Sequence, residues 1–240
     1  MISVIPAIDI IDGKCVRLAF GDFSKKVVYN ENPLEVAKIF EDAGLKRLHM
    51  VDLDGAKQGK VVNIKVLEKV ASDTNLIIDF GGGIKTNEDI DIALNNGATM
   101  ISTGSIAIKN KELFKEWLKQ YGPDKIIVAA DAKNEKVAVS GWQEETNISI
   151  FDCIKGLLDE GATKIMCTDI SKDGSLTGPA TELYGKLLNK FPSLHLIASG
   201  GISCLKDVED LDKIGCREVI VGKALYEGRI KLNELTPFIS

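Results

Sequence analysis

Short apolar runs alternate with amphipathic segments along the whole chain. The runs are nearly continuous in apolar residues, which is typical of strands buried on both faces of a parallel sheet. The amphipathic segments between them have the spacing of helices that cover such a sheet. We expect eight strands, at residues 2–9, 47–53, 76–80, 99–103, 126–131, 164–169, 195–199 and 217–222.

The expected helices begin and end with recognisable signals. Asn32-Pro33 provides an N-cap and a first-turn proline, and Thr86 with Asp89 forms a candidate capping box. A glycine stops each of four helices shortly before the next apolar run, where a left-handed residue closes the turn. These glycines are Gly44, Gly97, Gly161 and Gly215.

A glycine-rich turn occurs twice, each time directly after a predicted strand. Gly81-Gly82-Gly83-Ile84 and Gly200-Gly201-Ile202 lie at a fixed offset (202 − 84 = 118), and Gly104 and Gly222 repeat that offset downstream. Eight strand–helix units with a half-chain repeat predict a (β/α)8 TIM barrel built by internal half-barrel duplication, as a single domain over residues 1–240. An open doubly wound sheet is the alternative, but it requires neither eight units nor a repeat.

Composition narrows the class of protein. Net charge is −5, so the surface as a whole should not attract nucleic acid. No apolar run reaches the length of a membrane span, and the N-terminus lacks the basic region of a signal peptide. The five scattered cysteines and two histidines favour neither a disulfide framework nor a metal site, and they fit a reducing cytoplasm.

The repeated glycine turns are candidate phosphate sites. A glycine turn between strand and helix leaves backbone N–H groups free to hold an anion. One such turn is a weak signal, but two at one offset indicate a substrate with a phosphate at each end. Arg17 and Lys85 are cations that we expect near these turns, although surface ion pairing is an equally ordinary role for each.

Two aspartates end matching strands in the two halves. Asp9 follows Ala7-Ile8, and Asp131 follows Ala129-Ala130. In an eight-stranded barrel the first and fifth strands are diametrically opposed, so we expect the carboxylates to face each other as general base and general acid. Capping of the following loop is the simpler role for either one. Asp52 and Asp169 form a second matched pair, which we rank below the first because one carboxylate of each neighbouring pair, such as Asp52 and Asp54, should bond loop backbone.

The remaining candidates are aromatic, hydroxyl and imidazole groups. Trp142 lies in a polar loop, where it either stacks on a substrate ring or anchors the loop. Thr168 either bonds a substrate hydroxyl or satisfies a strand neighbour. We expect Trp117, His49 and His195 to be structural.

Five stretches of the chain resemble the ProFAR isomerase family of histidine biosynthesis. They are PAIDIIDGKCVRL at 6–18, LHMVDLDGA at 48–56, GGGI at 81–84, VSGWQE at 139–144 and CTDISKDG at 167–174. The resemblance runs nearly end to end. It implies a two-phosphate (β/α)8 barrel without cofactor or metal. The implied reaction is an Amadori-type isomerisation, in which an aminoaldose becomes an aminoketose.

The resemblance also implies roles for individual residues. Asp9 would accept the proton, Asp131 would donate one, Thr168 would assist at the sugar and Trp142 would stack on the substrate. The residues expected to bind substrate or its phosphates are Arg17, Gly82, Gly83, Lys85, Gly104, Ser105, Trp142, Asp173, Gly178, Gly200, Gly201, Gly222 and Lys223. Lys85, Ser175 and Lys223 depart from the residues common in the family, and at position 85 a bidentate grip on phosphate is lost.

Three other functions stay open at this point. The sister cyclase subunit of imidazole glycerol phosphate synthase shares the duplicated barrel and both aspartates, but it lacks the Ser-Gly-Trp-Gln loop. A side activity in tryptophan biosynthesis is compatible with the same motifs. A non-catalytic phosphosugar-binding barrel would keep the glycine turns but would not need opposed aspartates. We expect a monomer that binds a small bisphosphorylated molecule, without a nucleic-acid or membrane partner.

Overall fold

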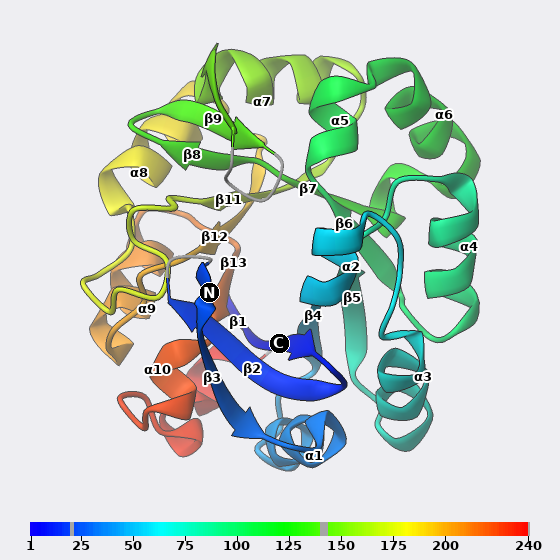
Figure 1. Ribbon diagram of the computed structural model, residues 1–240. Helices are drawn as coiled ribbons and strands as arrows, with labels where there is room; N and C mark the ends of the chain where they lie inside the picture. The colour runs from blue at the N-terminus through cyan, green and yellow to red at the C-terminus, as the bar shows by residue number, and fades with distance from the viewer. Residues whose placement is uncertain (20–21, 140–143, 240) are drawn as a thin grey trace.

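The computed structural model is a closed barrel of eight parallel strands, and the description below covers residues 1–19, 22–139 and 144–239. The barrel strands are β1 (Ser3–Ile11), β4 (Arg47–Asp52), β5 (Ile77–Gly81), β6 (Met100–Thr103), β7 (Ile126–Ala129), β11 (Lys164–Thr168), β12 (His195–Ser199) and β13 (Glu218–Val221). Pairing between β13 and β1 closes the ring (Figure 1). The predicted (β/α)8 barrel is therefore confirmed.

Helices surround the ring and cover its outer face (Figure 1). The longer ones are α1 (Pro33–Asp42), α3 (Ile64–Asp73), α4 (Asn87–Asn95), α6 (Lys111–Tyr121), α7 (Ile150–Asp159), α8 (Thr181–Lys190) and α9 (Leu205–Lys213). The shorter ones are α2 (Leu53–Gln58), α5 (Ser105–Lys109) and α10 (Lys223–Tyr226), with 3-10 turns at η1 (Pro123–Lys125) and η2 (Leu232–Phe238). Within the described residues, no helix combines the length and the apolar character needed to cross a membrane.

The predicted helix signals act as expected. The Asn32 side chain accepts from Leu34 N at 3.2 Å, and Thr86 and Asp89 form a capping box. Gly44, Gly97, Gly161 and Gly215 all have φ between 92° and 100°. The left-handed glycine returns the chain toward the next strand at each of these ends.

Two apolar clusters stabilise the barrel, one on each face of the sheet. The larger lies between strands and helices, and it contains the fully buried Trp117, Phe114 and Phe80. The smaller fills the barrel axis as a plug made of Ile5, Ala7, Met100, Ile127, Met166, Ile197 and Ile220. The interior is therefore packed, and a substrate has room only above the plug, at the carboxyl ends of the strands.

The long connections contain more structure than the sequence predicts. The connection after β1 contains β2 (Lys14–Ala19), which forms an antiparallel hairpin with β3 (Asp22–Asn30). The fifth barrel strand ends at Ala129 rather than at Asp131, because Asp131 instead begins a small antiparallel sheet of β8 (Asp131–Lys133), β9 (Lys136–Val139) and β10 (Glu144–Ser149). The hairpin and the small sheet lie over the barrel on opposite sides of the ring (Figure 1).

The two halves repeat at the level of backbone conformation. Gly82 and Gly83 have φ of 96° and 85°, and Gly200 and Gly201 have φ of 87° and 84°. Gly104 and Gly222, which precede the short helices α5 and α10, have φ of −117° and −113°. The sequence repeat is therefore also a repeat of backbone geometry.

Candidate active site

The candidate catalytic residues form a ring directly above the apolar plug. Side chains alternate along a strand, so Asp9 shares the inward face of β1 with Ile5 and Ala7. Thr168 follows Met166 on β11 in the same way and is 5% exposed. Asp9 and Thr168 thus lie at the mouth of the barrel, on its inner side.

Asp131 lies on the other side of that mouth. It follows Ile127 and Ala129 at the inward spacing, although it already belongs to β8. Its strand neighbours bring it beside β11, since Ala130 N donates to Met166 O at 2.8 Å and Ala132 bridges Asp169. Four steps around the ring separate β1 from β7 in either direction. Asp9 and Asp131 are therefore held by opposite sides of the barrel, as the sequence predicts.

Asp9 has a cationic partner. Arg17 reaches back from β2, and its Nη1 donates to Asp9 Oδ2 at 2.6 Å. Both side chains are 15% exposed, so the ion pair is largely shielded from water. Burial works against the charge on Arg17, but the carboxylates of Asp9 and Asp173 outweigh it and raise the pKa of the guanidinium.

The same arginine lines a pocket with the second glycine turn. Six of the residues expected to bind substrate line it: Arg17, Asp173, Gly200, Gly201, Gly222 and Lys223. A Cβ at position 222 would lie 1.9 Å from Arg17 Nη2, so glycine lets the guanidinium approach the backbone here. The guanidinium thus lies against the glycine that follows β13.

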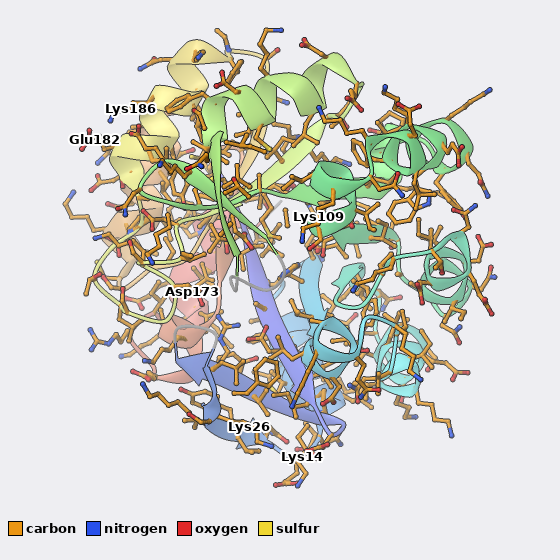
Figure 2. All side chains as sticks on the ribbon, turned by 45° about the horizontal axis from the view of Figure 1, so that its top comes forward. Lys14, Lys26, Lys109, Asp173, Glu182 and Lys186 are labelled. Atoms are coloured by element: carbon orange, nitrogen blue, oxygen red, sulfur yellow. The ribbon has the colours of Figure 1, made fainter. Side chains whose placement is uncertain are left out.

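Asp173 contributes a carboxyl group to this pocket from the loop between β11 and α8, where Figure 2 labels it. Burial raises the pKa of Asp173, and the nearby Asp9 carboxylate adds to the rise, while Arg17 and Lys223 oppose it. Lys223 Nζ donates to Gly174 O at 2.9 Å, on the same loop. Arg17 and Lys223 are therefore the cationic side chains that line this pocket among the described residues.

Glycine is required at position 201 of the pocket, because two backbone segments touch there. Gly178 N donates to Gly201 O at 3.0 Å, and a Cβ on Gly201 would lie 2.4 Å from Gly178 O. Gly178, which we expected to bind substrate, is shown here supporting the second glycine turn.

The first glycine turn has the same construction. A Cβ on Gly82 would lie 2.1 Å from Asp52 O, and one on Gly83 would lie 2.4 Å from Lys60 O. Gly104 packs against Ala129 O and precedes Ser105 at the start of α5. Lys85 is exposed, and its Nζ would lie 2.8 Å from a Cβ on Gly59, so its ammonium group rests over the end of α2.

Both carboxylates of the second aspartate pair bond groups of the following loops. Asp52 is fully buried and accepts from Gly55 N, Val62 N and Asn63 N at 2.7–2.8 Å. Asp169 accepts from Ser171 N at 3.0 Å and from Ser171 Oγ at 2.6 Å. These carboxylates hold the loops that carry the mouth residues.

The histidines and Trp117 are structural too. His49 Nδ1 bonds Asp79 within the barrel, His195 pairs with Glu218 at 3.2 Å, and Trp117 Nε1 donates to Asn87 Oδ1 at 2.6 Å. Trp142 lies outside the described residues, so its role stays a prediction. The five cysteines are free thiols.

Sequence reasoning missed three residues at this site. Ser199 and Leu176 line the pocket, and Leu176 has a φ of 55°, which is uncommon for a branched side chain. Tyr226 donates to Ala7 O at 2.8 Å and stacks on Tyr29 of the hairpin at 4.8 Å between ring centroids. The position of Tyr226, an aromatic residue four positions after Gly222, could have indicated its role. No local sequence pattern marks Ser199 or Leu176.

Comparison with known proteins agrees with this architecture. The family model described as "Histidine biosynthesis protein" matches residues 3–231. A protein of Phocaeicola vulgatus is 56% identical over 239 residues, covering 100% of both chains. A protein of Parabacteroides distasonis is 54% identical over 238 residues, covering 99% of this chain and 100% of the relative. One from Flavobacterium psychrophilum is 55% identical over 236 residues, covering 98% of each.

All three relatives carry one name, that of an isomerase whose imidazole-4-carboxamide bears two 5-phosphoribosyl groups. The matched lengths include both glycine turns, both opposed aspartates and Arg17, the partner of Asp9. The chain therefore belongs to the histidine biosynthesis protein family and groups there with its imidazole-4-carboxamide isomerases.

Proposed function

We propose that this protein catalyses the Amadori-type isomerisation of the bisphosphorylated intermediate ProFAR to its ribulosyl form in histidine biosynthesis. The observation that carries this proposal is the placement of Asp9 and Asp131 on opposite sides of the barrel mouth, above an apolar plug. An aldose–ketose interconversion needs a proton donor and a proton acceptor on either side of one sugar. The names of the relatives support the same reaction.

The chemistry is internal to the substrate. Asp131 protonates the furanose ring oxygen, and the nitrogen lone pair at C1′ opens the ring as a Schiff base. Asp9 then removes the proton on C2′, which leaves an enolamine. Protonation at C1′ and loss of the hydroxyl proton at C2′ give the ketone. Atoms and electrons balance without an external oxidant or reductant.

The two glycine turns hold the ends of the substrate in this proposal. Backbone N–H groups at Gly82–Gly83 and Gly200–Gly201 bind the two phosphates, assisted by Gly104, Ser105 and Gly222. Lys85 and Lys223 add positive charge to the first and the second turn. Thr168 bonds a sugar hydroxyl, Trp142 stacks on the heterocycle, and Asp173 faces the substrate from its loop.

The cellular setting follows from the same chemistry. A small anionic metabolite held by local groups requires no nucleic-acid partner, and the overall charge of −5 disfavours one. We expect a monomer, since all the proposed site residues come from one chain. Free thiols fit a reducing cytoplasm.

The alternatives are distinguished by one assay. Purified protein is mixed with ProFAR, and conversion to the ribulosyl product is followed, with the cyclase and tryptophan-pathway substrates as parallel reactions. Conversion of ProFAR supports the proposal. Phosphosugar binding without turnover would favour the non-catalytic barrel, and turnover confined to the cyclase substrate would favour the sister enzyme.

The two-phosphate claim has its own test. Binding energy from a remote phosphate positions the reacting sugar, so an analogue lacking either phosphate should lose turnover as well as affinity. Equal turnover of a monophosphate analogue would show that one glycine turn is idle.

A further inference from the structure

Arg17 stands between the proposed base and the second glycine turn. Its Nη1 bonds Asp9 Oδ2 at 2.6 Å, while Nη2 faces Gly222, where a Cβ would be only 1.9 Å away. One guanidinium therefore presents one amino group to the carboxylate and the other to the pocket. The pair is 15% exposed on each side, so little water is available to replace either contact.

The charged groups around Asp9 and Arg17 show which cation is available to a phosphate in the pocket. Asp9 is faced by Arg17 and Cys15 from β2, by His49 from β4, by Tyr226 from α10 and by Asp173 from the loop after β11. Lys223, the other cation lining the pocket, already donates to Gly174 O and lies 3.7 Å from Glu227. A phosphate entering the pocket must therefore draw on Arg17, which is already the partner of Asp9.

We propose that Arg17 is a counter-ion shared between Asp9 and the terminal phosphate of the substrate, so that arrival of the phosphate withdraws Arg17 from Asp9 Oδ2 and frees that oxygen to accept the C2′ proton. This inference rests on the proposed function. It makes Arg17 a positioning residue, which acts on the sugar through Asp9.

The physical basis is a competition for one fork of donors. A guanidinium binds a phosphate in a bidentate manner and more strongly as the charge of the anion grows. Without substrate, Arg17 donates to Asp9 Oδ2. Its charge also offsets the negative charges of Asp9 and Asp173 in the pocket. Because coupling between two sites is reciprocal, the charge on Asp9 must weaken phosphate binding as much as phosphate weakens the Asp9–Arg17 contact.

The experiment measures inorganic phosphate binding by amide NMR titration of the full chain. Backbone signals of Gly201 and Gly222 report the second glycine turn, and those of Gly83 and Gly104 report the first one in the same sample. The proteins are wild type, Asp9→Asn, Arg17→Met and the double variant, with Asp131→Asn as the matched control from the opposite strand. The dispersion of the amide spectrum checks folding of each.

The expected result is a gain in affinity from loss of the base. Asp9→Asn should tighten phosphate at Gly201 and Gly222 by about five- to tenfold, the low end of coupling between sites. The gain should disappear when Arg17→Met is already present. Asp131→Asn should change neither turn, and the first turn should respond to none of these substitutions.

Three results would overturn the inference. Unchanged or weaker phosphate binding in Asp9→Asn would show that Arg17 serves both partners at once. An equal gain in the Arg17→Met background would reduce the effect to direct repulsion between Asp9 and phosphate. Absence of phosphate binding at Gly222 would remove the site altogether. None of these outcomes requires turnover, so they are separate from a failure of the isomerase assay.

Discussion

At the mouth of the barrel, Asp9 and Asp131 follow inward-facing apolar side chains on their strands, Ile5 and Ala7 before Asp9 and Ile127 and Ala129 before Asp131. Each aspartate therefore lies where the apolar plug ends. The residues that surround each one differ. Asp9 on β1 is paired with Arg17 on β2, whereas Asp131 begins the separate small sheet at β8. Matching positions in the two halves thus have unlike surroundings, which suits opposite roles in one reaction.

Replacing either aspartate tests those roles. Asp9→Asn and Asp131→Asn should each reduce turnover by on the order of 10²–10⁴, the usual contribution of one general acid or base. Asp9→Asn should be the more severe, because Asp9 is the group assigned to remove the C2′ proton, while water can partly assist ring opening. Circular dichroism should show both variants folded, and wild type should have a bell-shaped dependence of rate on pH. Near-normal turnover in either variant would make that aspartate a loop cap.

At the scale of single elements, the glycine turns are places where backbone approaches backbone. Gly201 has a φ of 84° and lies against Gly178 O, and Gly83 has a φ of 85° and lies against Lys60 O. A side chain would be strained at both positions and would push the loop away from its neighbour. These loops therefore owe their shape to the absence of Cβ atoms.

Alanine at Gly201 should destabilise the protein and disturb phosphate binding together. We expect a loss of about 1–3 kcal/mol from the left-handed backbone alone, with more from overlap with Gly178 O. Gly185 in the middle of α8 is the matched control, since no atom lies within 4 Å of a Cβ placed there. Gly185→Ala should stabilise by roughly 0.5–1 kcal/mol. Urea unfolding of both variants decides the matter, and equal midpoints would refute the packing argument.

At the scale of the whole molecule, the barrel interior also holds a layer of polar side chains, in which His49 and Asp79 are in register with the plug residues Ala7 and Met100. His49 bonds Asp79, Arg47 lies 3.6 Å from Asp79 and also bonds Glu218, and Glu218 pairs with His195. These side chains come from β4, β5, β12 and β13, so the layer ties together strands that are distant in the sequence. It is a structural layer that the sequence alone hardly suggests.

The layer predicts how stability depends on pH. Burial works against the charge on His49, but Asp79 outweighs it through its charge and hydrogen bond, and the pKa of His49 rises above 6.5. A raised pKa means that His49 binds its proton more tightly in the folded protein than in the unfolded chain. The stabilisation is therefore complete below about pH 6.5 and is lost as pH rises through the folded value.

The His49→Asn variant measures this contribution. It should cost roughly 3–5 kcal/mol of unfolding free energy near pH 6, as expected for a broken buried pair, and less at alkaline pH. His195→Asn, which retains the His49–Asp79 pair, should keep the loss of stability that wild type shows as pH rises above about 6.5. Urea midpoints across the pH range give the comparison. A cost for His49→Asn that is constant with pH would contradict a charged His49.

The helix boundaries were predicted correctly where their physical cause is local. Asn32, Thr86 and the helix-ending glycines are recognised because caps and left-handed turns depend on neighbours within a few residues. The second capping box was missed because Cys204 stands at its first position, although Asp207 accepts from Ser203 N and Cys204 N just as Asp89 accepts from Lys85 N and Thr86 N.

Sequence alone determined the eight strand–helix units, the half-chain repeat and the candidate aspartates. Periodicity, glycine turns and strand ends each depend on residues that are close together in the sequence. Tertiary structure alone decided the partners across the barrel. The contacts of Arg17 with Asp9 and Gly222, the support of Gly201 by Gly178 and the polar layer around His49 each depend on how neighbouring strands pair around the ring. Such contacts depend on register and side-chain direction in three dimensions, which no spacing along the chain encodes.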